Sequence, residues 1–89
     1  MAYRIEIDRQ ALKALAALPK KVQRQVAARI DALAEDPFPS DAQQIKGQDD
    51  IWRIRSGSYR IAYTVRQNIL CILVLRVGDR KDFYRHFNR

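Results

Sequence analysis

The chain has 89 residues, 47% of them hydrophobic, and a net charge of +7 at pH 7. This length predicts one small domain, residues 1–89, with a single modest core. No apolar run approaches the roughly 20 residues of a membrane span, no signal-peptide core follows the N-terminus, and a single cysteine excludes an internal disulfide. The sequence therefore predicts a cytoplasmic protein with no membrane partner.

The chain begins with a predicted strand and helix. Residues 3–7 alternate between apolar and polar side chains, as a half-buried strand does. Asp8 is a typical N-cap for a first helix. Leu12, Leu15 and Leu18 recur at helical spacing and give this helix one apolar stripe.

A second helix begins at Pro19, a residue that fits the first turn of a helix. Its apolar stripe consists of Val22, Val26, Ile30 and Leu33. The short connection between the two helices predicts a helical hairpin. A loop over residues 36–41, with the sequence DPFPSD, ends the second helix.

A strand is predicted over residues 52–55. Within it, Trp52 and Ile54 point to one side of a sheet, and Arg53 and Arg55 point to the other. Ser-Gly-Ser follows as a turn, so the next strand is expected to pair with this one.

Two more strands complete the chain. Residues 59–66 alternate again, with Arg60 and Ala62 on the side opposite Ile61. Gln67-Asn68 predicts a tight hairpin turn. The almost continuous apolar run over residues 69–77 is typical of a central strand covered on both faces, and Gly78 ends it.

The predicted order is β-α-α-β-β-β, an α+β fold of two layers with a mostly antiparallel sheet and the N-terminal helical hairpin on one face. The strands can supply the apolar side chains under the helices, namely Trp52, Ile54, Ile61 and Tyr63. Arg53, Arg55 and Arg60 would then share the opposite face. Arg80, just beyond the last strand, could approach the same face.

The excess of positive charge lies in the second half of the chain. Residues 1–50 contain eight Lys and Arg and eight Asp and Glu, whereas residues 51–89 contain nine against two, which accounts for the whole +7. Clustered cations repel one another, so this distribution predicts a polyanion such as nucleic acid as a partner. The alternative is a basic strand face that is simply solvated.

Arginines that converge on one patch can grip a phosphate, because the planar guanidinium donates two parallel hydrogen bonds. They would also stabilise the charge that develops when the 2′-OH of RNA attacks that phosphate and leaves a cyclic phosphate and a 5′-OH end. The sequence shows no zinc spacing, no clustered carboxylates for two metals and no phosphate-binding glycine loop. We therefore expect metal-independent chemistry without a cofactor.

Three segments resemble the RelE/ParE toxin superfamily: WRIR at 52–55, YRIAY at 59–63 and LRVGDRKDFYR at 75–85. The resemblance covers nearly the whole chain and implies the same two-layer fold. RelE-type members are toxins of type II toxin–antitoxin pairs that cut mRNA in the ribosomal A site. By motif, the resemblance implies catalytic roles for Arg53, Arg55, Arg60, Arg80 and Tyr84.

The same resemblance implies partners. These are a cognate RelB-like antitoxin that folds on binding, the ribosome and mRNA, with DNA contacted only through the antitoxin. Lys46, Lys81 and Arg85 are candidates for sequence-independent contacts to RNA or ribosomal phosphates.

Two positions depart from the best-known pattern of the superfamily. Arg53 and Arg55 stand where lysines are usual, and arginine almost never loses a proton, so both would act as electrostatic clamps and not as a base. The base would then be Tyr84, His86 or a group on the ribosome. Asp79 stands where many relatives have histidine, which removes a possible proton carrier.

The sequence leaves two other functions open. A ParE-like toxin would inhibit DNA gyrase without nuclease activity, and an inactive relative would only bind RNA or protein. The arginines acting as one site are the feature that favours the RelE branch.

Overall fold

The computed structural model describes residues 2–79 and Phe83. In chain order the elements are β1 (Arg4–Ile7), α1 (Arg9–Ala16), α2 (Lys20–Ala32), β2 (Gln43–Ile45), β3 (Gln48–Ser56), β4 (Tyr59–Arg66), a 3-10 helix (Gln67–Ile69) and β5 (Cys71–Asp79). The five strands form one sheet in the order β1-β5-β4-β3-β2. The pair β1–β5 is parallel and the other pairs are antiparallel.

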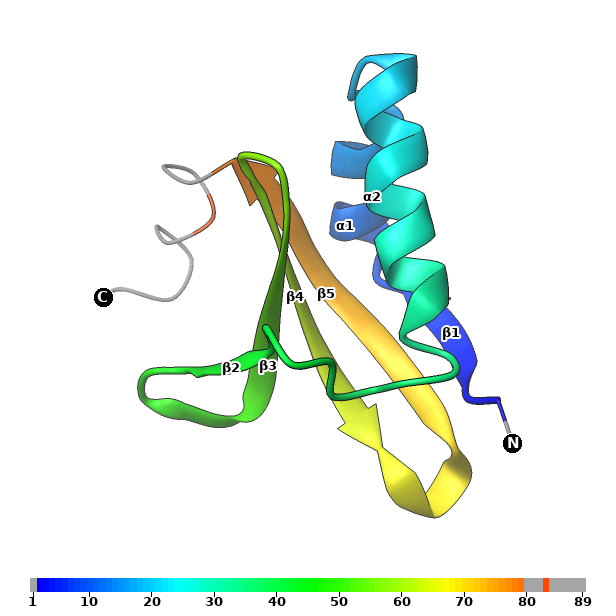
Figure 1. Ribbon diagram of the computed structural model, residues 1–89, viewed down its shortest axis with the longest axis vertical. Helices are drawn as coiled ribbons and strands as arrows, with labels where there is room; N and C mark the ends of the chain where they lie inside the picture. The colour runs from blue at the N-terminus through cyan, green and yellow to red at the C-terminus, as the bar shows by residue number, and fades with distance from the viewer. Residues whose placement is uncertain (1, 80–82, 84–89) are drawn as a thin grey trace.

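The two helices cover one face of this sheet (Figure 1). The predicted α+β fold, with two layers and an N-terminal helical hairpin on one face, is therefore confirmed. The Asp8 carboxyl caps α1 by accepting a hydrogen bond of 3.0 Å from the Gln10 backbone N–H. Pro19 is the N-cap of α2 and lies just outside the first turn in which it was expected.

The apolar stripes of the helices face the sheet. Val26, Ile30 and Leu33 are buried as predicted. Leu12 was expected in the stripe of α1 but is 53% exposed, and Ala11 is buried instead. The reason is the helical phase, because Ala11 and Leu15 lie one turn apart on the side facing the sheet.

The predicted alternation of the two arginine-bearing strands is confirmed. Ile54, Ile61 and Tyr63 are fully buried in the main core, and Trp52 packs against its edge. In the register of β3 and β4, Trp52 lies opposite Tyr63 and Ile54 lies opposite Ile61. Side chains that alternate with these must point away from the helices.

The sheet contains one strand more than the pattern predicted. β2 was missed, and β3 starts at Gln48, four residues before the predicted start. The two strands form a hairpin that turns at Lys46-Gly47, where Gly47 has φ +81°. Glycine adopts this left-handed conformation at no steric cost. The hairpin projects beyond the rest of the sheet in Figure 1.

The connection between β4 and β5 also differs from the prediction. The tight turn expected at Gln67-Asn68 is a 3-10 turn followed by Leu70 in a left-handed conformation, with φ 50°. As a result β5 begins at Cys71 rather than at residue 69, and it continues through Gly78 to Asp79.

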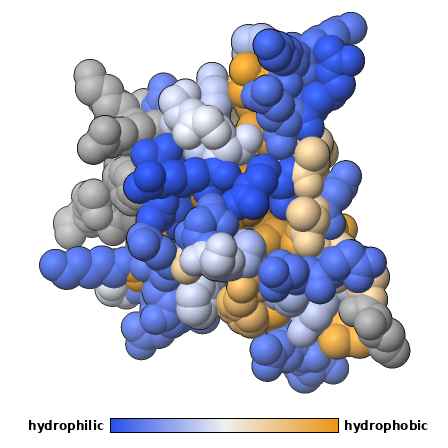
Figure 2. Space-filling view, viewed as in Figure 1, coloured by the Kyte–Doolittle hydropathy of each residue, from blue (hydrophilic) through white to orange (hydrophobic). Residues whose placement is uncertain are grey.

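Neither helix in the described part of the chain is long and apolar enough to cross a lipid bilayer. Figure 2 shows a surface on which hydrophilic residues dominate and hydrophobic residues appear in small separate groups.

We expect Ile54→Ala to lower the free energy of unfolding by about 2–5 kcal/mol, because the change leaves a cavity between the sheet and the helices. Leu12→Ala is the matched control, since its side chain is exposed and its loss leaves no cavity. Urea denaturation of both variants measures the difference. Equal losses of unfolding free energy for the two variants would contradict the placement of Ile54 in the core and of Leu12 on the surface.

Candidate functional site

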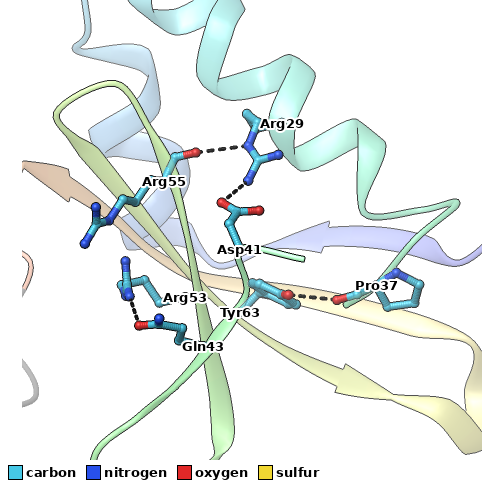
Figure 3. Close-up of polar contacts among 7 residues, drawn as sticks. All are labelled: Arg29, Pro37, Asp41, Gln43, Arg53, Arg55 and Tyr63. Carbon is cyan, nitrogen blue, oxygen red and sulfur yellow. Dashed lines mark hydrogen bonds and ion pairs between the residues drawn. The ribbon is translucent and has the colours of Figure 1, made fainter. Parts of the chain in front are cut away.

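Three arginines gather on the sheet face opposite the helices, which we call the arginine face. Arg55 of β3 lies directly opposite Arg60 of β4, and Arg53 lies opposite Ala62. Residues directly opposite each other in an antiparallel pair point to the same face. Figure 3 shows the side chains of Arg53 and Arg55 on the side of β3 away from α2.

Two of these arginines are buried. Arg53 and Arg60 are each 7% exposed, whereas Arg55 is exposed. Arg53 Nη2 donates a hydrogen bond to Gln43 Oε1 of β2 (Figure 3), and Arg60 Nη1 donates one of 3.2 Å to the Ser58 carbonyl. Both acceptors are uncharged, so they orient the guanidinium groups without neutralising them.

Carboxylates are paired with arginines elsewhere. The ion pairs within the described residues are Arg4–Glu6 at 3.0 Å, Arg29–Asp41 at 2.6 Å and Arg76–Asp8 at 3.9 Å. None of them involves an arginine of the arginine face. The alternative of a solvated basic strand therefore applies to Arg55, whose side chain is exposed. It does not apply to Arg53 or Arg60, because both side chains are buried.

Arg60 also has an unused donor. Its Nε atom is buried and has no hydrogen-bond partner among the residues that the structure describes. A buried donor without an acceptor costs about 1–3 kcal/mol, and the cost is larger when the donor belongs to a charged group. An anion bound on this face would supply the missing acceptor and the missing negative charge together.

The loop between α2 and β2 is tied to the sheet on the helix side. The Tyr63 hydroxyl donates a hydrogen bond of 2.7 Å to the Pro37 carbonyl (Figure 3). Burial of the Tyr63 side chain raises the pKa of its hydroxyl, so it stays a donor. Phe38 packs edge-on against Trp52, with ring centroids 4.9 Å apart. These contacts fix the loop that leads into β2 and Gln43.

The same loop carries Asp41, which contacts Arg29 of α2. Arg29 Nη2 donates to Asp41 Oδ2 at 2.6 Å, and Arg29 Nε donates to the Arg55 carbonyl at 3.0 Å (Figure 3). Partial burial raises the pKa of the Asp41 carboxyl, but the hydrogen bond and the charge of Arg29 outweigh it and the pKa lies below its usual value.

This lowered pKa predicts a pH dependence. Its contribution to stability is fully present above the unfolded pKa of about 3.9 and is lost as the pH falls through the lower folded pKa. We therefore expect wild type to be more stable than Asp41→Asn at neutral pH, and the difference to shrink below about pH 4. Urea denaturation across this range measures it. A stability difference between the two proteins that does not change with pH would show that the charge of the Asp41 carboxylate is not what stabilises the fold.

Of the other predicted site residues, Lys46 is the one that lies within the part of the chain that the structure describes. Lys46 is exposed at the turn of the β2–β3 hairpin, and it directly follows Ile45, which packs against Ala62 of the arginine face. Arg80, Tyr84, Lys81 and Arg85 lie outside the described residues.

Phe83, which directly precedes Tyr84, packs on the arginine face. It is 1% exposed and forms a second apolar cluster with Ile45 and Ala62. Its backbone approaches Gly78 so closely that a Cβ there would lie 3.5 Å from the Phe83 nitrogen. Phe83 thus lies on the same face of the sheet as Arg53 and Arg60.

Sequence reasoning missed Gln43, Arg29 and Asp41. Gln43 orients Arg53 only because β2 pairs with β3, and the turn glycine at 47 was the signal for that strand. Arg29 and Asp41 meet through a loop that has no periodicity, so no sequence pattern indicates their contact. Within the described residues, no group of His, Cys, Asp and Glu side chains could hold a metal ion.

Comparison with known proteins agrees with the fold. Residues 5–84 match the family model described as "ParE toxin of type II toxin-antitoxin system, parDE". The mRNA interferase toxin RelE of Escherichia coli K12 is 31% identical over 83 residues, which cover 91% of this chain and 86% of that protein.

Two solved complexes contain a similar chain. In the archaeal RelE–RelB complex from Pyrococcus horikoshii the match has a TM-score of 0.79 at 34% identity and covers 91% of this chain and 98% of that one. In the intact Escherichia coli RelBE toxin–antitoxin complex the TM-score is 0.78 at 28% identity, with coverage of 90% and 99%. The chain therefore belongs to the RelE/ParE superfamily of type II toxin–antitoxin toxins and is RelE-like.

Proposed function

We propose that this toxin is a ribosome-dependent endoribonuclease that cuts mRNA in the A site without a metal ion. The observation that carries the proposal is Arg60, a buried arginine with an unpartnered Nε and no carboxylate among its described contacts. A relative 31% identical over 83 residues is named an mRNA interferase, which supports the same reaction class.

In the proposed step the 2′-oxygen of one nucleotide attacks the adjacent phosphorus. The new 2′-O–P bond forms as the P–O5′ bond breaks, which leaves a 2′,3′-cyclic phosphate and a 5′-OH end. Arg53, Arg55 and Arg60 bind the phosphate and stabilise the extra negative charge on its oxygens in the transition state. The proton of the 2′-OH goes to a base, and the leaving 5′-oxygen takes up a proton.

Arg80 and Tyr84 complete the proposed catalytic set. Arg80 directly follows Asp79, which pairs with Tyr59 at the start of β4, and Tyr84 directly follows Phe83, which packs on the arginine face. Lys46, Lys81 and Arg85 are proposed as sequence-independent phosphate contacts.

Arginine cannot serve as the base at neutral pH. The proposal therefore assigns proton removal to Tyr84, to His86 or to a ribosomal group. This is also the reason to expect no cleavage of free RNA, because the ribosome must hold the 2′-OH in line for attack.

The proposed partners are the ribosome, mRNA and a cognate antitoxin similar to RelB. Similar chains are found in RelE–RelB complexes, which supports the antitoxin. An antitoxin segment with acidic residues would neutralise the arginine face, and it would fold as it binds. Contact with DNA would then occur only through the antitoxin.

The proposal is tested by mapping mRNA 5′ ends in a bacterial cell-free translation reaction with wild type, Arg80→Ala and Arg24→Ala. Arg24 is an exposed residue of α2 on the opposite layer, so its variant is the charge-matched control. We expect cuts inside translated codons with wild type and Arg24→Ala, none without ribosomes, and a strong loss with Arg80→Ala.

The match to a ParE family model favours one other candidate, a toxin that inhibits DNA gyrase. Intact mRNA in the presence of folded wild-type protein, together with inhibition of gyrase supercoiling, would replace the nuclease proposal with this one. Intact mRNA and unaffected gyrase would instead indicate a relative that only binds RNA or protein.

A further inference from the structure

The edge of β3 is unusual at Arg55. β2 pairs with β3 only as far as Gln43, which lies opposite Arg53, so Arg55 lies beyond the end of β2. A backbone N–H or C=O on an unpaired strand edge needs another partner. Here the Arg55 carbonyl accepts the 3.0 Å hydrogen bond from Arg29 Nε, and a backbone hydrogen bond from Arg55 contributes to the lowered pKa of Asp41.

The side chains of Arg29 and Asp41 thus take the place of the missing strand. Arg29 provides the donor that a continued β2 would have offered, and Asp41 holds Arg29 in place through the 2.6 Å ion pair. They come from α2 and from the loop before β2, so Arg55 is joined to parts of the chain 26 and 14 residues away.

Arg55 needs such support for an electrostatic reason. It lies directly opposite Arg60, and like charges in directly opposite positions of a strand pair repel. Arg29 alone would add a third cation to this place. Asp41, at 2.6 Å, neutralises Arg29, so the pair supplies a hydrogen bond to the Arg55 backbone with no added net charge.

We propose that Arg29 and Asp41 are positioning residues that hold Arg55 beside Arg60 on the arginine face. They do so from the opposite layer of the fold and do not touch the RNA. The inference deepens the proposed function and rests on its claim that the arginine face binds RNA phosphate.

The test is the affinity for a single-stranded 2′-O-methyl RNA oligonucleotide at low salt, measured by fluorescence anisotropy. This RNA lacks a free 2′-OH and cannot be cut, so binding is measured separately from cleavage. We expect Arg29→Met to weaken binding about 5- to 10-fold, because a misplaced Arg55 loses its charge-assisted hydrogen bonds to phosphate. Arg24→Met, on the exposed side of the same helix, removes the same charge and should change binding less than about 2-fold.

Asp41→Asn separates positioning from simple electrostatics. If Arg29 and Asp41 acted only through their charges, removing a carboxylate would strengthen binding to a polyanion. If they position Arg55, the same change weakens binding. Tighter binding by Asp41→Asn would overturn the proposal.

A double-mutant cycle with Arg55→Gln gives the second check. Arg29→Met should have less than about a 2-fold effect when Arg55 is already absent, because the two changes act through one interaction. An equal loss in both backgrounds would show that Arg29 supports the fold in general. In that case the proposal is wrong.

Amide hydrogen exchange provides a readout that needs no RNA. Arg29→Met should speed exchange at Arg55 much more than at Ile54, the buried neighbour in the same strand. Unchanged exchange at Arg55 would overturn the inference even if RNA binds. Absence of RNA binding by wild type, with the exchange result as expected, would instead overturn the proposed function.

Discussion

Arg60→Met is expected to abolish most of the RNA cleavage and to make the fold more stable. Loss of one preorganised donor to a transition-state anion typically slows a reaction about 10²–10³-fold. Methionine keeps much of the aliphatic stem of arginine, but it carries no charge and no unpartnered donor in a place that is only 7% exposed. We expect the free energy of unfolding to rise by about 1 kcal/mol, as when other buried charges are replaced by apolar side chains.

Cleavage in a translation reaction and urea denaturation measure these two effects on the same sample. Arg24→Met is the control and should change neither. An Arg60→Met protein that is both inactive and less stable would show that Arg60 is a structural residue. A stable protein that still cuts mRNA would remove Arg60 from the site.

RNA binding by wild type is expected to weaken about 20-fold between 50 and 200 mM salt. Each phosphate neutralised on a single strand contributes about −0.7 to the slope of log affinity against log salt concentration, so three arginines give about −2. The oligonucleotide that cannot be cut is again the probe. Additional phosphate contacts from other basic residues would make the slope steeper.

Arg55→Gln should reduce the steepness of this slope by about 0.7, the contribution of one phosphate. Arg24→Gln should leave it unchanged, because that residue lies on the helix layer. An affinity that does not change from low to moderate salt would show that the arginine face does not bind a polyanion.

The strands that carry the arginines could be predicted because their alternation is strict. From Trp52 to Arg55, and from Tyr59 to Arg66, every second side chain is directed toward the helices, and this sets the face of Arg53, Arg55 and Arg60 without any three-dimensional information. The helical hairpin was predictable for the same kind of reason, although the choice between Leu12 and Ala11 was not.

What the sequence could not show depends on contacts between distant residues. β2 has three residues, too few for a periodic pattern, and its pairing decides that Arg53 has Gln43 as a neighbour. Burial of Arg53 and Arg60 depends on the packing around them, since an arginine on an alternating strand has the same pattern whether it is solvated or covered. The contact of Arg29 with Asp41 requires the loop to fold back, which no local preference encodes.

The parallel pairing of β1 with β5 has a consequence for how the protein is made. Arg4 lies opposite Cys71, so the first strand of the chain completes the sheet only after the last strand exists. Closure of so long a segment makes folding depend on non-local contacts. During synthesis β5 is made after β3 and β4, so the arginine-bearing strand β4 gains its second neighbour in the sheet only once β5 has left the ribosome.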